Sequence, residues 1–82
     1  MPPSADVDQA LAAAIRRQRE TRDFTQEDAA HAAHITVGTY GQIERGRVNP
    51  TWTTFKSIAR ALGITPSELA ALAERVEEPA AT

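Results

Sequence analysis

The sequence predicts an all-α fold, a single domain of five short helices. Its 82 residues are enough for one domain and too few for two, since domains usually run from about 50 to 250 residues. Hydrophobic residues make up 41% of the chain and charged residues 24%, as in an ordinary globular protein. Few residues are aromatic, so we expect a core of leucine, isoleucine, valine and many alanines, which favours closely approaching helices over a sheet.

The first predicted helix spans about residues 7–22. Asp6 is its candidate N-cap, with Gln9 three residues later. The arginines in its last turns complement the negative end of the helix dipole, so their ordinary role is to stabilise the helix. The positions that fall on its inner face are Val7, Leu11, Ala14, Ile15 and Gln18.

Two short predicted helices follow, about three residues apart. The second (25–33) starts at a capping box that runs from Thr25 to Asp28. The third (36–44) ends before Gly46, a residue typical of helix C-termini. Two helices joined by so short a link cross at a steep angle, which is the helix-turn-helix geometry.

The fourth and fifth predicted helices complete the fold. Asn49-Pro50 prevents a helix across the preceding loop, so the fourth helix begins after Thr51, its candidate cap. Trp52 is either a core anchor or a partly exposed plate near the loop, and we expect the core position. Thr65 caps the fifth helix, which begins with a proline. The inner faces consist of Phe55, Ile58, Ala59 and Leu62 in the fourth helix and of Leu69, Leu72, Ala73 and Val76 in the fifth.

Composition excludes several classes of protein. The chain contains no cysteine, which argues against a disulfide framework and a thiolate metal site. Its N-terminus lacks the basic start and apolar run of a signal peptide, and no stretch approaches the about 18 apolar residues of a membrane span. We therefore expect a cytoplasmic protein that makes no membrane contact.

The net charge of −2 is unevenly distributed. Residues 16–60 carry +3, whereas residues 1–15 carry −2 and residues 61–82 carry −3. A basic face can therefore coexist with an acidic total, and such a face suits phosphate groups.

Several motifs follow one another at fixed spacings: TQEDAA (25–30), IT (35–36), YGQIERGR (40–47), NP (49–50), IARALGIT (58–65) and EL (68–69). In this order they resemble the phage Cro/repressor-type helix-turn-helix family, also called the xenobiotic-response-element family, over about residues 10–72. The resemblance implies a compact five-helix, lambda-repressor-like DNA-binding domain over 6–77, with its helix-turn-helix at about 25–45. The ends, 1–5 and 78–82, are expected to be disordered.

The resemblance implies that the third helix enters the major groove of double-stranded DNA. Of the residues at its front and outer face, Gln42 carries an amide that can pair bidentately with adenine, and Val37 can contact a thymine methyl. The alternative for Gln42 is an ordinary solvated helix residue. The residues that match base-contacting positions are Thr36, Val37, Gly38 and Gln42.

A second set matches positions that contact phosphates or hold the helices together. Arg19 and Glu44 match a pair that ties the first helix to the end of the third; the alternative is two unpaired surface charges. The residues that match phosphate contacts are Gln26, Arg45 and Arg47, with Lys56 as a weaker candidate.

Three residues depart from the family pattern. His34 stands where the family has a glycine in the turn, a place that often needs a positive φ. Gly38 and Gly41 each lower the stability of the helix by about 1 kcal/mol relative to alanine. Together they also leave the helix without two side chains that could read bases. Direct readout is therefore expected to be sparse, with DNA shape or water-mediated contacts carrying part of the specificity.

Two other classes of function are weighed against a regulator. Glu27, Asp28, His31 and His34 lie close together, yet the two histidines have no third ligand at a sensible spacing, so we expect neither catalysis nor a bound metal. An antitoxin-like interaction module with secondary DNA binding is the alternative, but the acidic tail after residue 73 is too short to wrap a toxin.

We therefore expect a DNA-binding transcriptional regulator, a repressor or a small controller protein, with no cofactor and no evident small-molecule ligand. One helix on one half-site offers too few base contacts for specificity, so a homodimer on an inverted-repeat operator is expected. Leu72 and Val76 on the fifth helix are the candidate dimer contacts.

Overall fold

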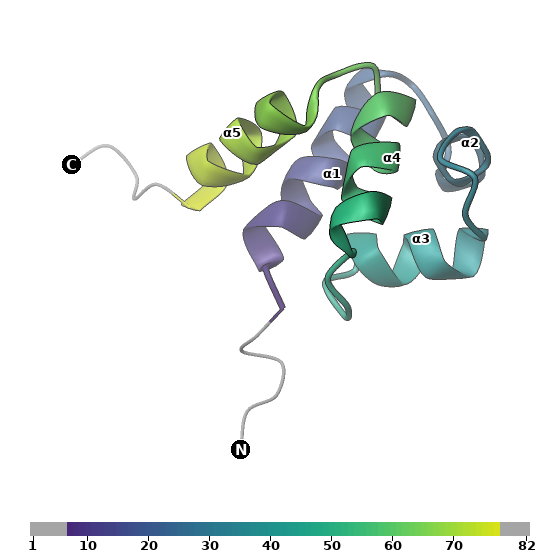
Figure 1. Cartoon of the computed structure of the whole chain (residues 1–82), viewed down its shortest axis with the longest axis horizontal. Coiled ribbons are helices and arrows are strands. Elements are labelled where there is room, and N and C mark those ends of the chain that lie inside the picture. Colours follow the sequence, from purple (N-terminus) through teal and green to yellow (C-terminus); the bar gives the residue numbers. More distant parts are fainter. Residues whose placement is uncertain (1–6, 78–82) are drawn as a thin grey trace.

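The computed structural model describes residues 7–77, and every regular element within them is an α-helix (Figure 1). The predicted five-helix fold is therefore confirmed. The ends that were expected to be disordered, 1–5 and 78–82, lie outside the described residues, and so does residue 6. The helices are α1 (Gln9–Thr21), α2 (Gln26–Ala32), α3 (Val37–Glu44), α4 (Trp52–Ala61) and α5 (Pro66–Glu77).

Each helix begins at a polar residue whose side chain accepts a backbone hydrogen bond, as the predicted caps at Thr25 and Thr51 require. The start of α1 differs from the prediction. Asp8 caps it by accepting the N–H of Leu11 at 2.9 Å, so α1 begins two residues later than expected. The predicted cap, Asp6, lies outside the described residues.

The first four helices all end in the same way, with a residue of left-handed backbone followed by a hydrogen bond back into the last turn. The φ angles are 61° at Asp23, 61° at His34, 72° at Gly46 and 77° at Gly63. In each case the next N–H bonds to a carbonyl five residues earlier, as Ile35 does to Ala30 at 3.0 Å. His34 thus takes the positive φ that was expected at its position.

The core joins all five helices. Small side chains such as Ala29, Ala30 and Ala59 are almost fully buried within it, which lets the helix backbones approach closely. The largest fully buried side chains are Tyr40, Ile15, Ile58, Leu62 and Leu69.

Trp52 is not part of that core, and the prediction that places it there is wrong. Its side chain is 63% exposed, because Trp52 is the first residue of α4 and lies at the N-terminal end of that helix. Its ring stacks on Phe55 with 5.5 Å between ring centroids.

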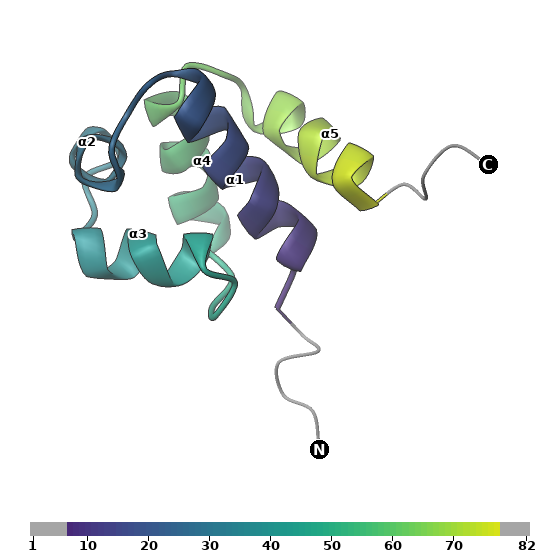
Figure 2. The ribbon, with the colours of Figure 1, turned by 180° about the vertical axis from the view of Figure 1, so that it is seen from behind.

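The arrangement leaves α3 at one end of the molecule. It crosses α2 steeply and also contacts α1, whereas α5 contacts α1 and α4 on the side opposite to α2 and α3 (Figures 1 and 2). One face of α3 is therefore uncovered. Within residues 7–77 no helix is long and apolar enough to cross a membrane.

Candidate nucleic-acid interface

Helix α3 directs Tyr40 and Ile43 into the core, whereas the residues of its first turn are exposed. Tyr40 is buried, whereas Val37 is 45% exposed and Gly38 is also exposed. Gln42 is half-buried on the same outward side. Three of the four predicted base-contacting residues therefore share the free face of α3, and the fourth, Thr36, directly precedes it.

The side chains of Thr36 and Gln42 differ in what they already contact. Thr36 Oγ1 accepts the N–H of Thr39 at 3.1 Å, so its hydroxyl caps α3. The side-chain amide of Gln42 makes no hydrogen bond to any residue between 7 and 77. It is the polar group of α3 that remains available for a base edge.

Gly41 is buried, although a side chain at this position was expected to be able to reach bases. The cause is the side chain of Arg45, one turn later, which folds back along α3. A Cβ atom at Gly41 would lie 2.9 Å from Nη1 and 3.0 Å from Nη2 of Arg45. The missing side chain of Gly41 thus makes the space in which the guanidinium of Arg45 lies.

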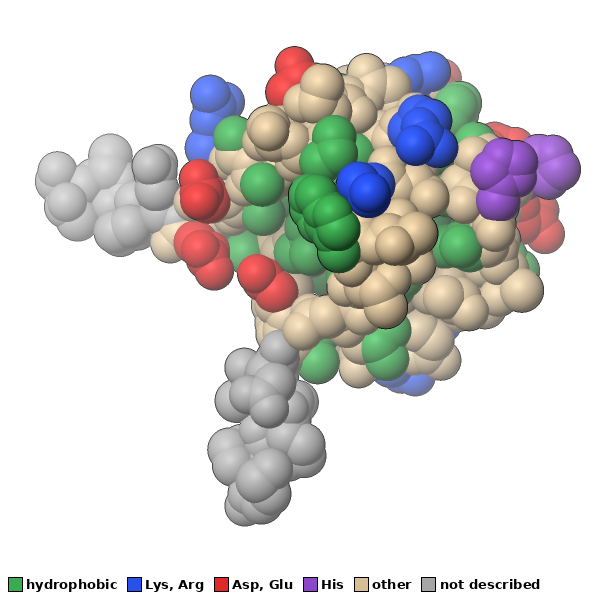
Figure 3. All heavy atoms as spheres, viewed as in Figure 1, with side chains coloured by type: hydrophobic (Ala, Val, Ile, Leu, Met, Phe, Trp, Pro, Cys, Tyr) green, Lys and Arg blue, Asp and Glu red, His purple; other side chains and the backbone are tan. Residues whose placement is uncertain are grey.

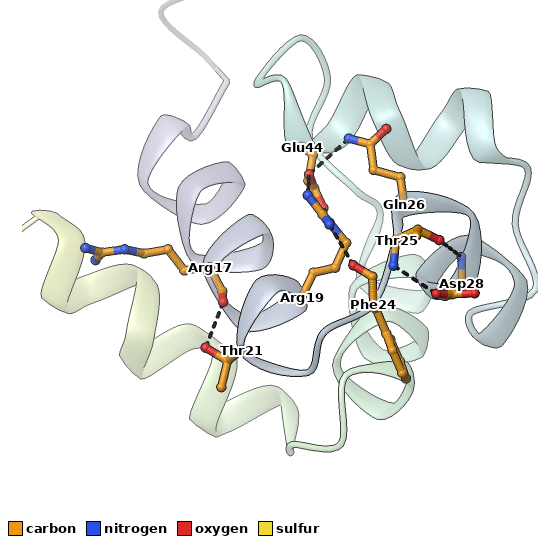
Figure 4. Close-up of polar contacts among 8 residues, drawn as sticks. All are labelled: Arg17, Arg19, Thr21, Phe24, Thr25, Gln26, Asp28 and Glu44. Carbon is orange, nitrogen blue, oxygen red and sulfur yellow. Dashed lines mark hydrogen bonds and ion pairs between the residues drawn. The ribbon is translucent and has the colours of Figure 1, made fainter.

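Arg19 and Glu44 connect α1 to the end of α3 (Figure 4). Arg19 Nε donates to one carboxylate oxygen of Glu44 at 2.6 Å and Nη2 donates to the other at 3.1 Å. Arg19 Nη1 also donates to the carbonyl of Phe24, in the link before α2, at 2.7 Å. A single guanidinium therefore fixes three segments of the helix-turn-helix region relative to one another.

Gln26, a predicted phosphate contact, lies at the start of α2 and belongs to the same cluster. Its side-chain amide donates to Glu44 at 3.0 Å (Figure 4). Burial would raise the pKa of Glu44, but hydrogen bonds to its carboxylate, chiefly those from Arg19, outweigh burial and hold that pKa below its usual value. Glu44 is thus a buried, charged and satisfied carboxylate.

The other predicted phosphate contacts lie in two places. Arg45 and Arg47 flank Gly46 in the turn after α3, and both are exposed. Lys56 lies on α4, with its ammonium 5.6 Å from the centre of the Trp52 ring. Lys56 therefore lies over the ring of the exposed Trp52.

One contact that positions this turn escapes sequence reasoning. Gln9 Nε2 donates to the carbonyl of Gly46 at 2.8 Å and ties the start of α1 to the turn after α3. In the sequence Gln9 fits a capping box with Asp6, a local pattern that gives no indication of a partner 37 residues away.

Another face of the molecule is apolar with an acidic border. Hydrophobic side chains gather beside α4, and acidic side chains lie near the end of α5 (Figure 3). A groove there is lined by Leu11, Trp52 and Phe55 together with the small residues of α5. Its acidic border consists of Asp8, Glu74 and Glu77.

The predicted dimer contacts lie on α5 but differ in exposure. Leu72 packs partly against the core, whereas Val76 is 36% exposed. The exposed apolar surface of Trp52, at 63%, is larger than that of either.

The histidines and acidic residues weighed as a metal site do not gather into one. Within residues 7–77 no group of three or more His, Cys, Asp or Glu side chains is arranged to hold a metal ion. Asp28 instead caps α2, where its carboxylate accepts the N–H of Thr25 at 2.9 Å.

Known proteins are similar to this chain in sequence and in fold. A family model described as a helix-turn-helix domain matches residues 10–72. The HTH-type transcriptional regulator DdrOP3 of Deinococcus deserti is 40% identical over 55 residues, which cover 67% of this chain and 43% of the relative. The chain therefore spans less than half the length of that regulator.

Two solved structures are similar over most of their length. The clp gene regulator ClgR from Corynebacterium glutamicum has a TM-score of 0.81 at 27% identity, over 87% of this chain and 92% of the other. The restriction-modification controller protein C.AhdI from Aeromonas hydrophila has a TM-score of 0.72 at 28% identity, over 74% of this chain and 92% of the other.

Proposed function

The chain belongs to the helix-turn-helix family of DNA-binding transcriptional regulators, and from this membership we propose that it recognises one operator sequence in double-stranded DNA. In this proposal α3 lies in the major groove and α2 crosses the phosphate backbone. The observation that carries it is the free face of α3, whose orientation is fixed from behind by the Arg19–Glu44 pair. A rigidly held reading helix suits sequence recognition, which requires precise placement at base edges.

Within this interface every predicted DNA contact except Lys56 keeps a proposed role. Gln42 pairs with one adenine, Val37 contacts a thymine methyl, and Gly38 permits close approach of the backbone. Thr36 adds its methyl group at the front of α3 while its hydroxyl caps the helix. Gln26, with its backbone N–H at the start of α2, joins Arg45 and Arg47 at the phosphates.

We propose that the working unit is a homodimer on an inverted repeat. Specific binding exceeds non-specific binding by about 4–10 kcal/mol, whereas one bidentate contact contributes about 1–3 kcal/mol. One copy of α3, with two glycines and a single free amide, falls short of that difference. Two copies related by a twofold axis double the base contacts and place the half-sites about one helical turn apart.

The dimer surface that we propose comprises Leu72 and Val76 on α5 together with the groove beside Trp52. The acidic border of this groove disfavours DNA, so its apolar surface is left for a protein partner. A second copy fits because it brings Lys56, which lies over the Trp52 ring, toward those acidic residues. The surface is thus apolar at its centre and offers both charges at its edge.

We assign the protein to the repressors or small controller proteins, in line with its similarity to C.AhdI. We place its action in the cytoplasm, where operator DNA lies.

The experiment that tests the function is selection of bound duplexes from a random pool. Enrichment of an inverted repeat with half-sites about 10 base pairs apart is expected. Recovery of unrelated sequences, with equal affinity for all of them, would reject sequence-specific regulation.

A further inference from the structure

A hollow with three arginines lies between α1 and the turn after α3. It has a volume of about 420 Å³ and is lined by Arg16 from α1 and by Arg45 and Arg47 from the turn. Ala12 and Ala13 also line it, so on the α1 side the hollow is bordered mainly by small side chains. Three arginines from two separate elements therefore line one space.

None of these three guanidinium groups makes a hydrogen bond or an ion pair with another residue in the described part of the chain. The one acidic residue that lines the hollow, Glu44, is already engaged. Its carboxylate accepts two hydrogen bonds from Arg19 and one from Gln26, and its side chain is 1% exposed. The positive charge of the hollow is therefore left without a partner in the protein.

We propose that this hollow binds one phosphate group of the DNA backbone, and that Arg16 is a phosphate-binding residue beside Arg45 and Arg47. This inference rests on the proposed binding of DNA. Planar guanidinium groups match phosphate oxygens in two-point hydrogen bonds, which suits a site built from three of them. Arg16 lies a full turn before the end of α1, so the dipole role that its sequence suggests is a weaker explanation.

The site is held in shape before any ligand arrives. Gln9 fixes the carbonyl of Gly46 between the two arginines of the turn, and Gln9 itself lines the hollow. Gly41 gives the guanidinium of Arg45 room to lie against α3. Arg16 projects from α1, the helix that Arg19 clamps to α3, so the distance across the hollow is fixed as well.

The test compares Arg16→Ala with Arg17→Ala on duplex DNA at several salt concentrations. Arg17 is the matched control, because it is exposed on the same helix and its side chain points away from the Glu44 cluster (Figure 4). Arg16→Ala should lower the slope of log affinity against log salt by about 0.9, on the preferred site and on unrelated DNA alike. Arg17→Ala should leave the slope at the wild-type value. Equal slopes for the two variants would overturn the inference.

A second arm locates the phosphate. Single methylphosphonates, which remove the charge of one phosphate, are placed in turn along a bound duplex. One position should weaken binding of the wild type by about tenfold, and binding of Arg16→Ala distinctly less, because that variant has already lost the contact. If every position weakens both proteins equally, Arg16 contacts no phosphate. If the wild type binds no duplex at all, the proposed function fails instead, and thermal melting of both variants checks that each is folded.

Discussion

The guanidinium of Arg19 and the carboxylate of Glu44 meet in a two-point ion pair, with N···O distances of 2.6 and 3.1 Å. The side chain of Glu44 is 1% exposed and that of Arg19 is 14% exposed. The pair therefore joins α1 to the C-terminal end of α3 from inside the protein, on the side away from the free face of α3. Neither charge can be removed without leaving the other in a poorly solvated place.

Arg19→Met is accordingly expected to destabilise the fold by about 3 kcal/mol, since it leaves the buried carboxylate of Glu44 without its cation. Urea denaturation of the free protein measures this loss. Glu44→Gln in the same background should recover part of it, because the neutral amide needs no cation. A double-mutant cycle without coupling would show that the pair contributes nothing to stability.

The same carboxylate gives the fold a pH dependence. Because the folded pKa of Glu44 lies below its ordinary value of about 4.3, the unfolded chain binds more protons in that range. The contribution of Glu44 to stability is therefore complete above about pH 4.3 and is lost as the pH falls through the folded pKa. Melting curves between about pH 6 and pH 3 should fall more steeply for the wild type than for Glu44→Gln. Parallel curves would contradict this assignment.

The features that sequence predicts well are those that depend on near neighbours. The caps at Thr25 and Thr51 and the left-handed residue at Gly46 act within four residues of themselves, so their patterns identify them. Asp23 ends α1 in the same left-handed conformation, but an aspartate there carries no such pattern.

The features that sequence misses depend on partners distant in the chain or on side-chain direction. Trp52 is a large aromatic residue of the kind that usually anchors a core, yet its place at the start of α4 leaves it exposed. Gln26 matches a position that contacts phosphate, but sequence gives no indication that its side-chain amide donates a hydrogen bond to Glu44, 18 residues away. The burial of Gly41 depends on how Arg45 folds back, which composition and spacing do not encode.

Gln42→Ala tests base reading. The variant should lose about 1–3 kcal/mol on the preferred site and relax the preference at one base position, because a bidentate amide contact is lost. Affinity for a random duplex should stay close to that of the wild type. Fluorescence anisotropy on both duplexes measures this, and an equal loss on the two would exclude Gln42 as a base reader.

Gly41→Ala should separate stability from binding. Alanine is a better helix former by about 0.5–1 kcal/mol, and the atom it would meet is the flexible end of Arg45, so the variant should melt at a higher temperature. The displaced guanidinium should weaken binding to all duplexes. In an Arg45→Ala background, Gly41→Ala should cost no further affinity, and an undiminished cost there would show that Gly41 acts on DNA directly.

The dimer surface is tested through Trp52. Its 63% exposure leaves an aromatic ring in solvent that a second copy would cover, so Trp52→Ser should weaken self-association on a palindromic duplex. Val48→Ser is the matched control for association, since Val48 is 45% exposed but does not line the groove. Analytical ultracentrifugation with and without the duplex should give two protein chains per palindrome for the wild type and for Val48→Ser, with a shift toward one chain for Trp52→Ser. A wild-type complex that stays at one chain per duplex at excess protein, with no preference for inverted repeats, would reject the dimer, whereas an unchanged Trp52→Ser dimer would move the contact away from this groove.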